Sequence, residues 1–433
     1  MHQHPQPRPA RRTNRALTAA TVCVLLLALA ACTSKDDDTT SPSADTPAPE
    51  VAADILGPED RASGEPVRIG MVSDGATPAF DASDELRAAE ATAEFWNTHR
   101  GGIGGRPIEI VACETGGEPA GATDCGNQMV EEGVVAVAQS QSAVGDSLWR
   151  PVHDAGVPTM LFQTSSQDAL LDAQSTFAIV NPLTALFGLP IAAAQEQGSA
   201  KVVFVLIDVP QAVQALETLG PGIMDQAGLD YEVVRVPPGT PDMTPQMHQV
   251  ADSGAGVVQV TGNDAFCIAA FNGLRAVGYE GTIVTLSQCI TDATRQAVPD
   301  GGLEGIQVAS SVAMGATDDP TFQLHQAVIA TYGDDVRHAD DPTTMGGYTT
   351  IAALATALDG ITGDITPETV TATIKAMPPQ ELPGGGGVTY QCNGTTSTLL
   401  PAVCTNQWLN TTLDNDGQTT TYEKIDSTDI LPG

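Results

Sequence analysis

The chain has 433 residues, with 53 Asp and Glu against 18 Lys and Arg, so its formal net charge is −35. This excess of negative charge disfavours nucleic acid binding, which relies on neutralising phosphates, and docking on anionic lipid headgroups. Aromatic residues make up only 4% of the chain, which argues against an aromatic surface for carbohydrate. We interpret the acidity as a solvated protein surface.

The N-terminus has the pattern of a secretory signal peptide over residues 1–31. Four arginines precede an apolar stretch over 16–31, which is short for a transmembrane helix. The stretch ends in Leu29-Ala30-Ala31-Cys32, which resembles the bacterial lipobox, in which the cysteine is lipidated and becomes the new N-terminus. The resemblance implies an extracytoplasmic protein anchored to the cell membrane through Cys32. An ordinary signal peptide with an incidental cysteine is the alternative.

A polar segment begins at the lipobox cysteine. Residues 32–65 are rich in Ser, Thr, Asp, Pro and Ala and contain almost no large apolar side chain. Such a segment cannot bury enough surface to offset the entropy that ordering it costs. We therefore expect a disordered tether over 32–65, with the folded part beginning near Val67.

Six cysteines remain when Cys23 leaves with the signal peptide and Cys32 is lipidated. They form three local couples: Cys113 with Cys125, Cys267 with Cys289, and Cys392 with Cys404. An exported protein meets the oxidising conditions in which disulfides form, although six cysteines allow many pairings. Zinc binding is the rival interpretation, but none of these spacings is typical of zinc ligands. We predict three local disulfides and no metal site.

Short β-branched runs alternate with longer amphipathic segments after residue 66. The runs expected to form strands are 67–72, 107–113, 134–139, 157–162, 176–180, 201–207, 230–236, 256–262, 281–286 and 305–311. Helices are expected between them, for example over 84–99, 119–133 and 264–278. This alternation predicts an α/β fold with right-handed crossovers and parallel sheets that are covered on both faces.

The segments VRIGMVSDG, GGIGGRPIEI, DAGVP and RAVGYEGTIVTLSQC occur in this order. From Val67 to about Lys375, the chain resembles the type I periplasmic binding proteins of the leucine/isoleucine/valine-binding kind. The resemblance implies two doubly wound parallel-sheet lobes, a hinge of three crossings, and a solute held in the cleft between the lobes. We expect 66–184 and 312–377 to form the first lobe, and 185–311 and 378–430 the second.

Polar side chains follow the expected first-lobe strands, at the sheet edge where ligands bind in parallel sheets. They are Ser73, Asp74, Ser140, Ser142, Gln163, Thr164, Ser165 and Ser166. Hydroxyls and free N–H groups at helix N-termini can hold a carboxylate. We therefore expect Ser142, Thr164 and Ser165 to bind the anionic end of a solute, with plain N-capping as the alternative.

In the second lobe, the tyrosine and the acidic residue of the family pattern fall near Gln211 and Asp264. The glutamine departs from that pattern and puts a branched-chain amino acid in doubt as the solute. Tyr348 is expected either to close one wall of the cleft or to lie in the core. The expected solute is an amino acid or a related carboxylate or amide.

The chain contains no G-x-S-x-G, Walker, H-E-x-x-H or G-x-G-x-x-G motif. His153 beside Asp154 is only a weak candidate for acid–base chemistry. We therefore expect a monomeric, lipid-anchored solute-binding protein, not an enzyme, that needs no cofactor and serves the permease subunits of an ABC importer. A lipid-anchored sensor of the same fold is the alternative, and an exported hydrolase is a weaker one.

Overall fold

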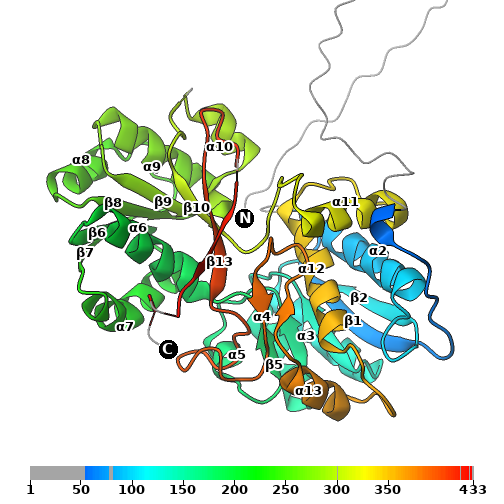
Figure 1. Ribbon diagram of the computed structural model, residues 1–433. Coiled ribbons are helices and arrows are strands. Elements are labelled where there is room, and N and C mark those ends of the chain that lie inside the picture. Colours follow the sequence, from blue (N-terminus) through cyan, green and yellow to red (C-terminus); the bar gives the residue numbers. More distant parts are fainter. Residues whose placement is uncertain (1–53, 78–80, 300, 420, 429, 432–433) are drawn as a thin grey trace, which may run out of the picture. The chain divides into compact units, whose positions relative to one another are not determined.

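The computed structural model describes residues 54–77, 81–299, 301–419, 421–428 and 430–431, and Figure 1 shows the course of the chain. The expected signal peptide, Cys32 and the expected tether up to residue 53 lie outside the described residues. Two largely parallel sheets organise the described part, and each forms the centre of one lobe. The prediction of an α/β fold with two doubly wound lobes is confirmed.

The segment 54–65 packs against the first lobe, contrary to the expectation of a tether that extends to residue 65. Leu56 is buried in the first-lobe core, and Ile55 packs against the same core. The backbone N–H of Asp60 donates a hydrogen bond to the carbonyl of Thr98. Two adjacent apolar side chains, several backbone hydrogen bonds and the Arg100 side chain, which donates to the carbonyl of Leu56, hold this short segment, although its average composition is polar.

The first lobe is built on a parallel sheet with the strand order β2-β1-β3-β4-β5. Its strands are β1 (Val67–Ser73), β2 (Ile108–Glu114), β3 (Ala136–Gln139), β4 (Thr159–Leu161) and β5 (Thr176–Ala178). All five lie within or next to a run that the sequence predicts to be a strand. Because β1 pairs with both β2 and β3, the winding of the chain changes direction between β1 and β3. Open parallel sheets bind ligands at such a switch point.

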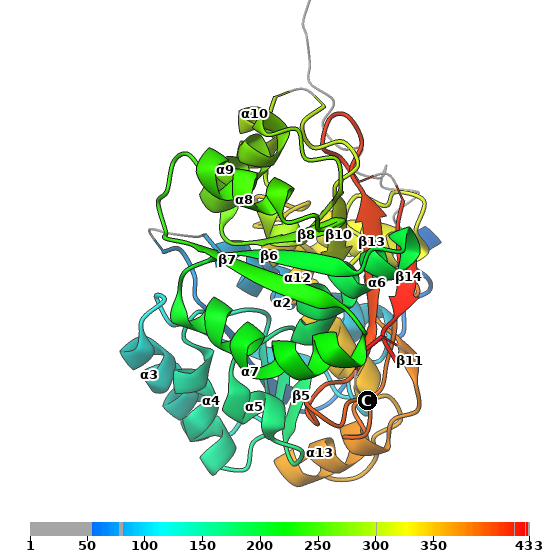
Figure 2. The same ribbon diagram turned by 90° about the vertical axis from the view of Figure 1, so that its left-hand side faces the viewer.

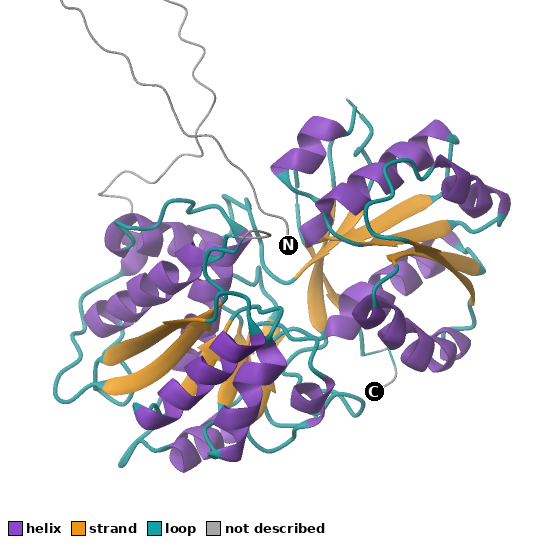
Figure 3. Cartoon of the chain, turned by 180° about the vertical axis from the view of Figure 1, so that it is seen from behind, coloured by secondary structure: helices purple, strands orange, loops and turns teal. Residues whose placement is uncertain are grey.

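Helices cover both faces of this sheet, as Figure 3 shows. They are α2 (Ser83–His99), α3 (Pro119–Glu131), α4 (Gly145–Asp154), α5 (Gln167–Leu171), α11 (Pro320–Tyr332), α12 (Pro342–Ala357) and α13 (Pro367–Ala376). One face of the sheet buries Val72 and Val137 together with Met129 of α3 and Leu148 of α4. The other face buries Ile69 in the core that α2 and α12 share.

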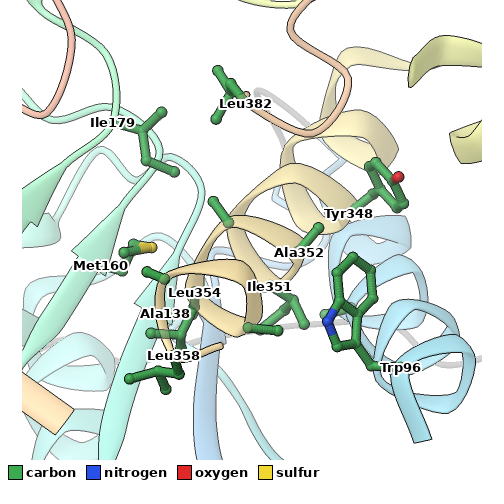
Figure 4. Packing of buried hydrophobic residues seen from close by; sticks show 14 of the residues in the cluster. Trp96, Ala138, Met160, Ile179, Tyr348, Ile351, Ala352, Leu354, Leu358 and Leu382 are labelled. Carbon is green, nitrogen blue, oxygen red and sulfur yellow. The ribbon is translucent and has the colours of Figure 1, made fainter. Parts of the chain in front are cut away.

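Helices α2 and α12 pack side by side and form the centre of the first-lobe core. Nearly all of α12 is buried, because its side chains are small or apolar on every side. Figure 4 shows Tyr348 and Ile351 on the side of Trp96 in α2, and Leu354 on the side of Met160 in the sheet. A fully buried Leu or Ile of this kind stabilises the fold by about 1.5–3 kcal/mol.

The second lobe has a sheet with the strand order β14-β13-β10-β9-β8-β6-β7. The parallel strands are β6 (Lys201–Ile207), β7 (Asp230–Val236), β8 (Val257–Thr261), β9 (Thr282–Leu286) and β10 (Gln307–Ser310). Two antiparallel strands, β13 (Gln407–Thr412) and β14 (Glu423–Asp426), extend the sheet beyond β10. The switch point of this sheet lies between β6 and β8.

The helices of the second lobe are α6 (Leu189–Gln197), α7 (Pro210–Gln226), α8 (Thr244–Asp252), α9 (Asp264–Ala276) and α10 (Asp292–Ala297), with a 3₁₀ turn η2 (Ser287–Cys289). Figure 2 shows α8 and α9 on one side of β6 and α7 on the other. Strand β6 serves both layers, because Val203 and Val205 join the core of α8 and α9, whereas Phe204 joins that of α6 and α7. A strand that is buried on both faces is apolar, as the sequence VVFVLI that follows Lys201 is.

The chain passes between the lobes three times, at residues 179–188, 311–319 and 391–406. The first passage ends in a π-helix, η1 (Thr184–Gly188), that continues directly into α6. It is hydrogen-bonded to the third passage, where the Asn181 side chain donates to Oδ1 of Asn406 over 2.9 Å. This hydrogen bond links the first passage to the third.

The tail after residue 378 divides between the lobes, whereas we expected all of 378–430 in the second. Strands β11 (Gln380–Glu381) and β12 (Thr389–Tyr390) form a separate two-stranded sheet. Leu382, Val388 and Tyr390 are buried in the first-lobe core, and the Tyr390 hydroxyl donates to the carbonyl of Ala353 in α12 over 2.7 Å. Their burial beside α12 assigns this part of the tail to the first lobe, and β13 and β14 belong to the second.

Three disulfides join Cys113 to Cys125, Cys267 to Cys289, and Cys392 to Cys404. These are the three local couples that the sequence predicts. The first disulfide joins β2 to α3 and the second joins α9 to η2, whereas the third closes part of the loop between β12 and β13. Within the described residues, no helix combines the length and the apolar character that crossing a membrane requires.

Candidate functional site

The polar residues that follow the first-lobe strands meet at the switch point between β1 and β3. Asp74 follows β1, and Ser142 lies in the loop after β3. The Ser142 hydroxyl donates to Oδ1 of Asp74 over 2.7 Å. Because adjacent parallel strands end at the same edge of a sheet, the order of strands alone is enough to bring these two loops together.

Two further donors complete the environment of Asp74, which is 8% exposed. The Thr115 hydroxyl donates to its Oδ1 atom over 2.6 Å, and the backbone N–H of Ala143 donates to Oδ2 over 3.0 Å. We expected Ser142 to bind a solute carboxylate, but its hydroxyl hydrogen is directed at the carboxylate of Asp74. Sequence analysis missed Thr115, although it directly follows β2 and the same rule would have found it.

Glu85, in the first turn of α2, is a second carboxyl group at this edge. It is 1% exposed, and burial raises its pKa to about 7. Hydrogen bonds from Ser73, Ser140 and the Gln141 backbone lower the pKa by less, and the charge of Asp74 raises it further. Its Oε2 atom has no hydrogen-bond partner among the described residues. No local signal distinguishes Glu85 from an ordinary acidic residue at a helix N-terminus, because its burial results from tertiary packing.

The loop after β4 uses most of its hydroxyls internally. Ser166 is the N-cap of α5 and accepts from the backbone N–H of Ala169 over 3.2 Å. The Thr164 hydroxyl accepts from the N–H of Ser166 over 3.1 Å. Gln163 donates from its side chain to Oε1 of Gln141. For Thr164 and Ser166 the capping interpretation therefore holds, whereas Ser165 is exposed.

In the second lobe, Asp264 is the first residue of α9, directly after β8. Its Oδ1 atom accepts from the N–H of Ala265 over 2.7 Å, and the helix is capped by Asn263, whose Oδ1 accepts from the N–H of Phe266. Gln211 belongs to the first turn of α7, after β6, and its side chain lies outside the description. Both positions follow the two strands that flank the second switch point.

Tyr348 does not line a surface. It is buried in the first-lobe core, as Figure 4 shows, and its hydroxyl has no partner among the described residues. Burial raises the pKa of this hydroxyl far above its usual range. Of the two roles expected for Tyr348, the structure supports the one in the core, because α12 is enclosed on all sides.

His153 lies in a polar cluster that superficially has the composition of a catalytic triad. Its Nδ1 atom is 3.3 Å from the Ser175 hydroxyl and 3.5 Å from Oδ2 of Asp172, and its ring stacks on Trp149. A triad needs the serine and the carboxylate at opposite ring nitrogens, but here both lie at the same one. Asp154, the neighbour in sequence, is not part of this cluster. Among the described residues, no group of three His, Cys, Asp or Glu side chains could hold a metal ion.

A surface depression of about 580 Å³ lies in the second lobe, between the loop 239–244 and α9. Its polar lining comes from Thr240, Asp242, Thr244, Asn263 and Asn272. This depression is on the helical layer, and the residues expected to bind a solute do not line it. The strand ends remain the better candidate, because two loops converge there on buried carboxyl groups.

The sequence matches the family described as periplasmic binding protein over residues 66–404. No curated protein matches the chain significantly. Three similar solved structures are an ABC transporter substrate-binding protein from Sphaerobacter thermophilus (TM-score 0.68, 18% identity, 85% of this chain and 100% of that chain), a leucine-, isoleucine-, valine-, threonine- and alanine-binding protein from Brucella ovis (0.69, 12%, 86% and 97%), and a fatty acid ABC transporter substrate-binding protein from Thermomonospora curvata (0.63, 17%, 86% and 95%). At these identities the likeness concerns the fold alone.

Proposed function

Because the chain belongs to the periplasmic binding protein family, we propose that it is an extracytoplasmic solute-binding protein of an ABC importer. It holds a small polar solute between its two lobes and delivers it to the permease subunits. The observation that carries this proposal is the convergence of Asp74 and Ser142, joined by a 2.7 Å hydrogen bond, at the switch point of the first sheet. Ligands of open parallel sheets bind at this position.

The chain connectivity supports a closing motion. Three short passages connect the lobes, and a hinge needs only a few residues that absorb the change in backbone angles. The ends of the second-lobe strands carry Asp264 and Gln211, which we propose face the solute from the other side. Ser73, Ser140, Gln163 and Ser165 complete the proposed contacts in the first lobe.

We further propose that the protein is anchored to the outer face of the cell membrane through a lipid on Cys32. The apolar stretch before this cysteine is short, and the segment after it is polar. Lipid anchoring keeps a solute-binding protein near its permease. The strong negative charge of the chain makes attraction to anionic headgroups an unsuitable substitute for a lipid.

Native mass spectrometry of the full-length protein, as purified from cells, tests solute binding directly. We expect a fraction of the molecules to carry a small molecule that dissociates on partial unfolding and can then be identified. Ser165→Ala should weaken binding of that molecule about ten- to a hundred-fold, the value of one hydrogen bond to a charged group. Ser175→Ala is the matched control, because Ser175 lies at the opposite end of the same sheet, directly before β5.

The affinities of Ser165→Ala and Ser175→Ala for the retained molecule show whether it binds at the proposed site. Equal loss of affinity in both variants, or no loss in either, would place the solute elsewhere on the protein. A protein that retains no small molecule, and that no solute in a broad thermal-shift library stabilises, would contradict the proposed function itself.

A further inference from the structure

Three hydrogen-bond donors at the first switch point are used by the carboxylate of Asp74. Its Oδ1 atom accepts from Thr115 and Ser142, and its Oδ2 atom accepts from the N–H of Ala143. Each carboxylate oxygen has two lone pairs, so Oδ1 is saturated and Oδ2 retains one free acceptor position. An internal anion therefore occupies three donors that a solute carboxylate could use, and the buried Nε2 atom of Gln139, at the end of β3, is left without a partner among the described residues.

A second carboxyl group is buried near the same edge of the sheet. Glu85 is 1% exposed, and its Oε2 atom has no partner among the described residues. It lies close enough to Asp74 for the charge of that carboxylate to raise the pKa of Glu85. An unpartnered acceptor that is this deeply buried favours a hydrogen-bond donor nearby. A second anion at this edge would instead add to the repulsion.

No basic side chain is available in the described residues to offset these carboxyl groups. Every arginine and lysine from Arg61 to Lys424 donates to a carboxylate or a backbone carbonyl elsewhere. None of them donates to the loops 73–75, 115–117, 139–144 or 162–166. With a net charge of −35, the surrounding potential also attracts cations and repels anions.

We infer that the solute presents a hydrogen-bond-donating cation, a primary ammonium or guanidinium group, to Asp74, and that it has no carboxylate at this edge. This inference rests on the proposed function and replaces the expectation of an anionic end held by Ser142. A quaternary ammonium ion is disfavoured, because its recognition relies on a cage of aromatic rings. Phe162 is the only aromatic residue that the structure describes in these loops.

Isothermal titration of the full-length wild-type protein, freed of any retained solute, tests the inference with four probes. Agmatine and putrescine are cations without a carboxylate, isoleucine is a zwitterion, and succinate is an anion. We expect agmatine or putrescine to bind at least ten-fold more tightly than isoleucine and succinate. This comparison needs no variant and therefore does not depend on whether a substitution folds.

Asp74→Asn then tests whether the charge of Asp74 binds the cation, because this change keeps the shape of the side chain and removes its charge. We expect the affinity for the cationic probe to fall at least ten-fold. Asp124→Asn is the matched control: Asp124 is exposed on α3 of the same lobe, so the net charge changes equally, and we expect less than a two-fold effect. Unchanged affinity in Asp74→Asn, or equal losses in both variants, would overturn the assignment.

The outcomes also separate this inference from the proposed function. Tighter binding of isoleucine or succinate to the wild type would overturn the inference and leave a solute-binding protein. Binding of none of the four probes would also overturn the inference. In that case the molecule found by native mass spectrometry, or its absence, decides whether the proposed function fails as well.

Discussion

A Cβ atom on Gly346 would lie 2.2 Å from the Oγ atom of Ser140. Helix α12 therefore approaches the end of β3 so closely that this position requires glycine. The next residue shows the same closeness: a Cβ on Gly347 would lie 2.3 Å from the backbone carbonyl oxygen of Glu85. Two adjacent glycines thus allow α12 to approach both the β3 loop and α2. This approach buries Glu85.

The two glycines should respond differently to substitution by alanine. In Gly346→Ala the Ser140 hydroxyl can rotate away, and we expect a loss of about 1 kcal/mol of unfolding free energy. In Gly347→Ala the obstacle is backbone, so α12 and α2 must separate, and we expect a loss of about 3 kcal/mol. Urea unfolding monitored by circular dichroism measures both. A larger loss in Gly346→Ala than in Gly347→Ala would contradict this account of the packing.

The raised pKa of Glu85 makes stability depend on pH. The folded protein retains the proton of Glu85 up to a pKa of about 7, whereas the unfolded chain releases it near 4.5. The unfolding free energy should therefore fall as pH rises from 4.5 to 7, by about 3 kcal/mol. Glu85→Gln should lack this component, and Glu90→Gln, an exposed change on the same helix, should retain it. Parallel pH profiles for wild type and Glu85→Gln would refute the prediction.

Titration of His325 should make the unfolding free energy depend on pH in the opposite direction. It is fully buried between the rings of Phe322 and Tyr348, neither ring nitrogen has a partner among the described residues, and burial lowers its pKa to about 4. The unfolded chain takes up a proton below about pH 6.5, and the folded protein does so only near 4. The unfolding free energy should therefore fall by about 3 kcal/mol as pH drops through this window.

Two histidine variants test this effect. His325→Leu should remove the loss of stability at low pH, and it should also stabilise the protein at neutral pH, because it replaces unpaired buried nitrogens by an apolar group. Exposed His248→Leu is the control and should leave the pH profile unchanged. A profile of His325→Leu that follows the wild type between pH 4 and 6.5 would show that His325 is not the responsible group.

The three disulfides should be found in protein purified from its exported form. Peptide mapping without reduction should yield only the linked pairs 113–125, 267–289 and 392–404. Replacing both cysteines of the 113–125 pair by serine should lower the unfolding free energy by about 3 kcal/mol, the value expected for a loop of this length. A peptide that links two different couples would contradict the assignment.

Cys32→Ser should move the protein from the membrane fraction to the soluble fraction of lysed cells. Cys23→Ser is the matched control, because Cys23 precedes the expected cleavage point and should not affect anchoring. Immunoblotting of the two fractions is sufficient. Equal membrane association of Cys32→Ser and the wild type would refute lipid anchoring through Cys32.

Most of the backbone was predictable from the sequence, and so was the sheet edge at which the candidate site lies. The run 201–207 forms a strand because six consecutive apolar residues, 202–207, suit burial on both faces, and 264–276 forms a helix that Asn263 caps, both from signals within a few residues. The two cysteines of each disulfide are also close in sequence, so these pairs were predictable as well. Asp74 and Ser142 were also found, because parallel strands place the ends of neighbouring loops at one edge. The pairing of these two residues with each other was not predicted, because the direction of a hydroxyl hydrogen depends on which acceptor is nearest in space.

The sequence by itself determined the succession of strands and helices, the local disulfides and the polar character of the strand ends. Only the tertiary structure decided which side chains lose contact with water. Glu85, Tyr348 and Leu56 stand in unremarkable local sequences, and each is buried by an element distant in the chain. Desolvation depends on all neighbours at once, so it shifts a pKa or assigns a residue to the core without leaving a pattern in the sequence. For this reason the fold was predictable, whereas the burial of Glu85 and the pairing of Ser142 with Asp74 were not.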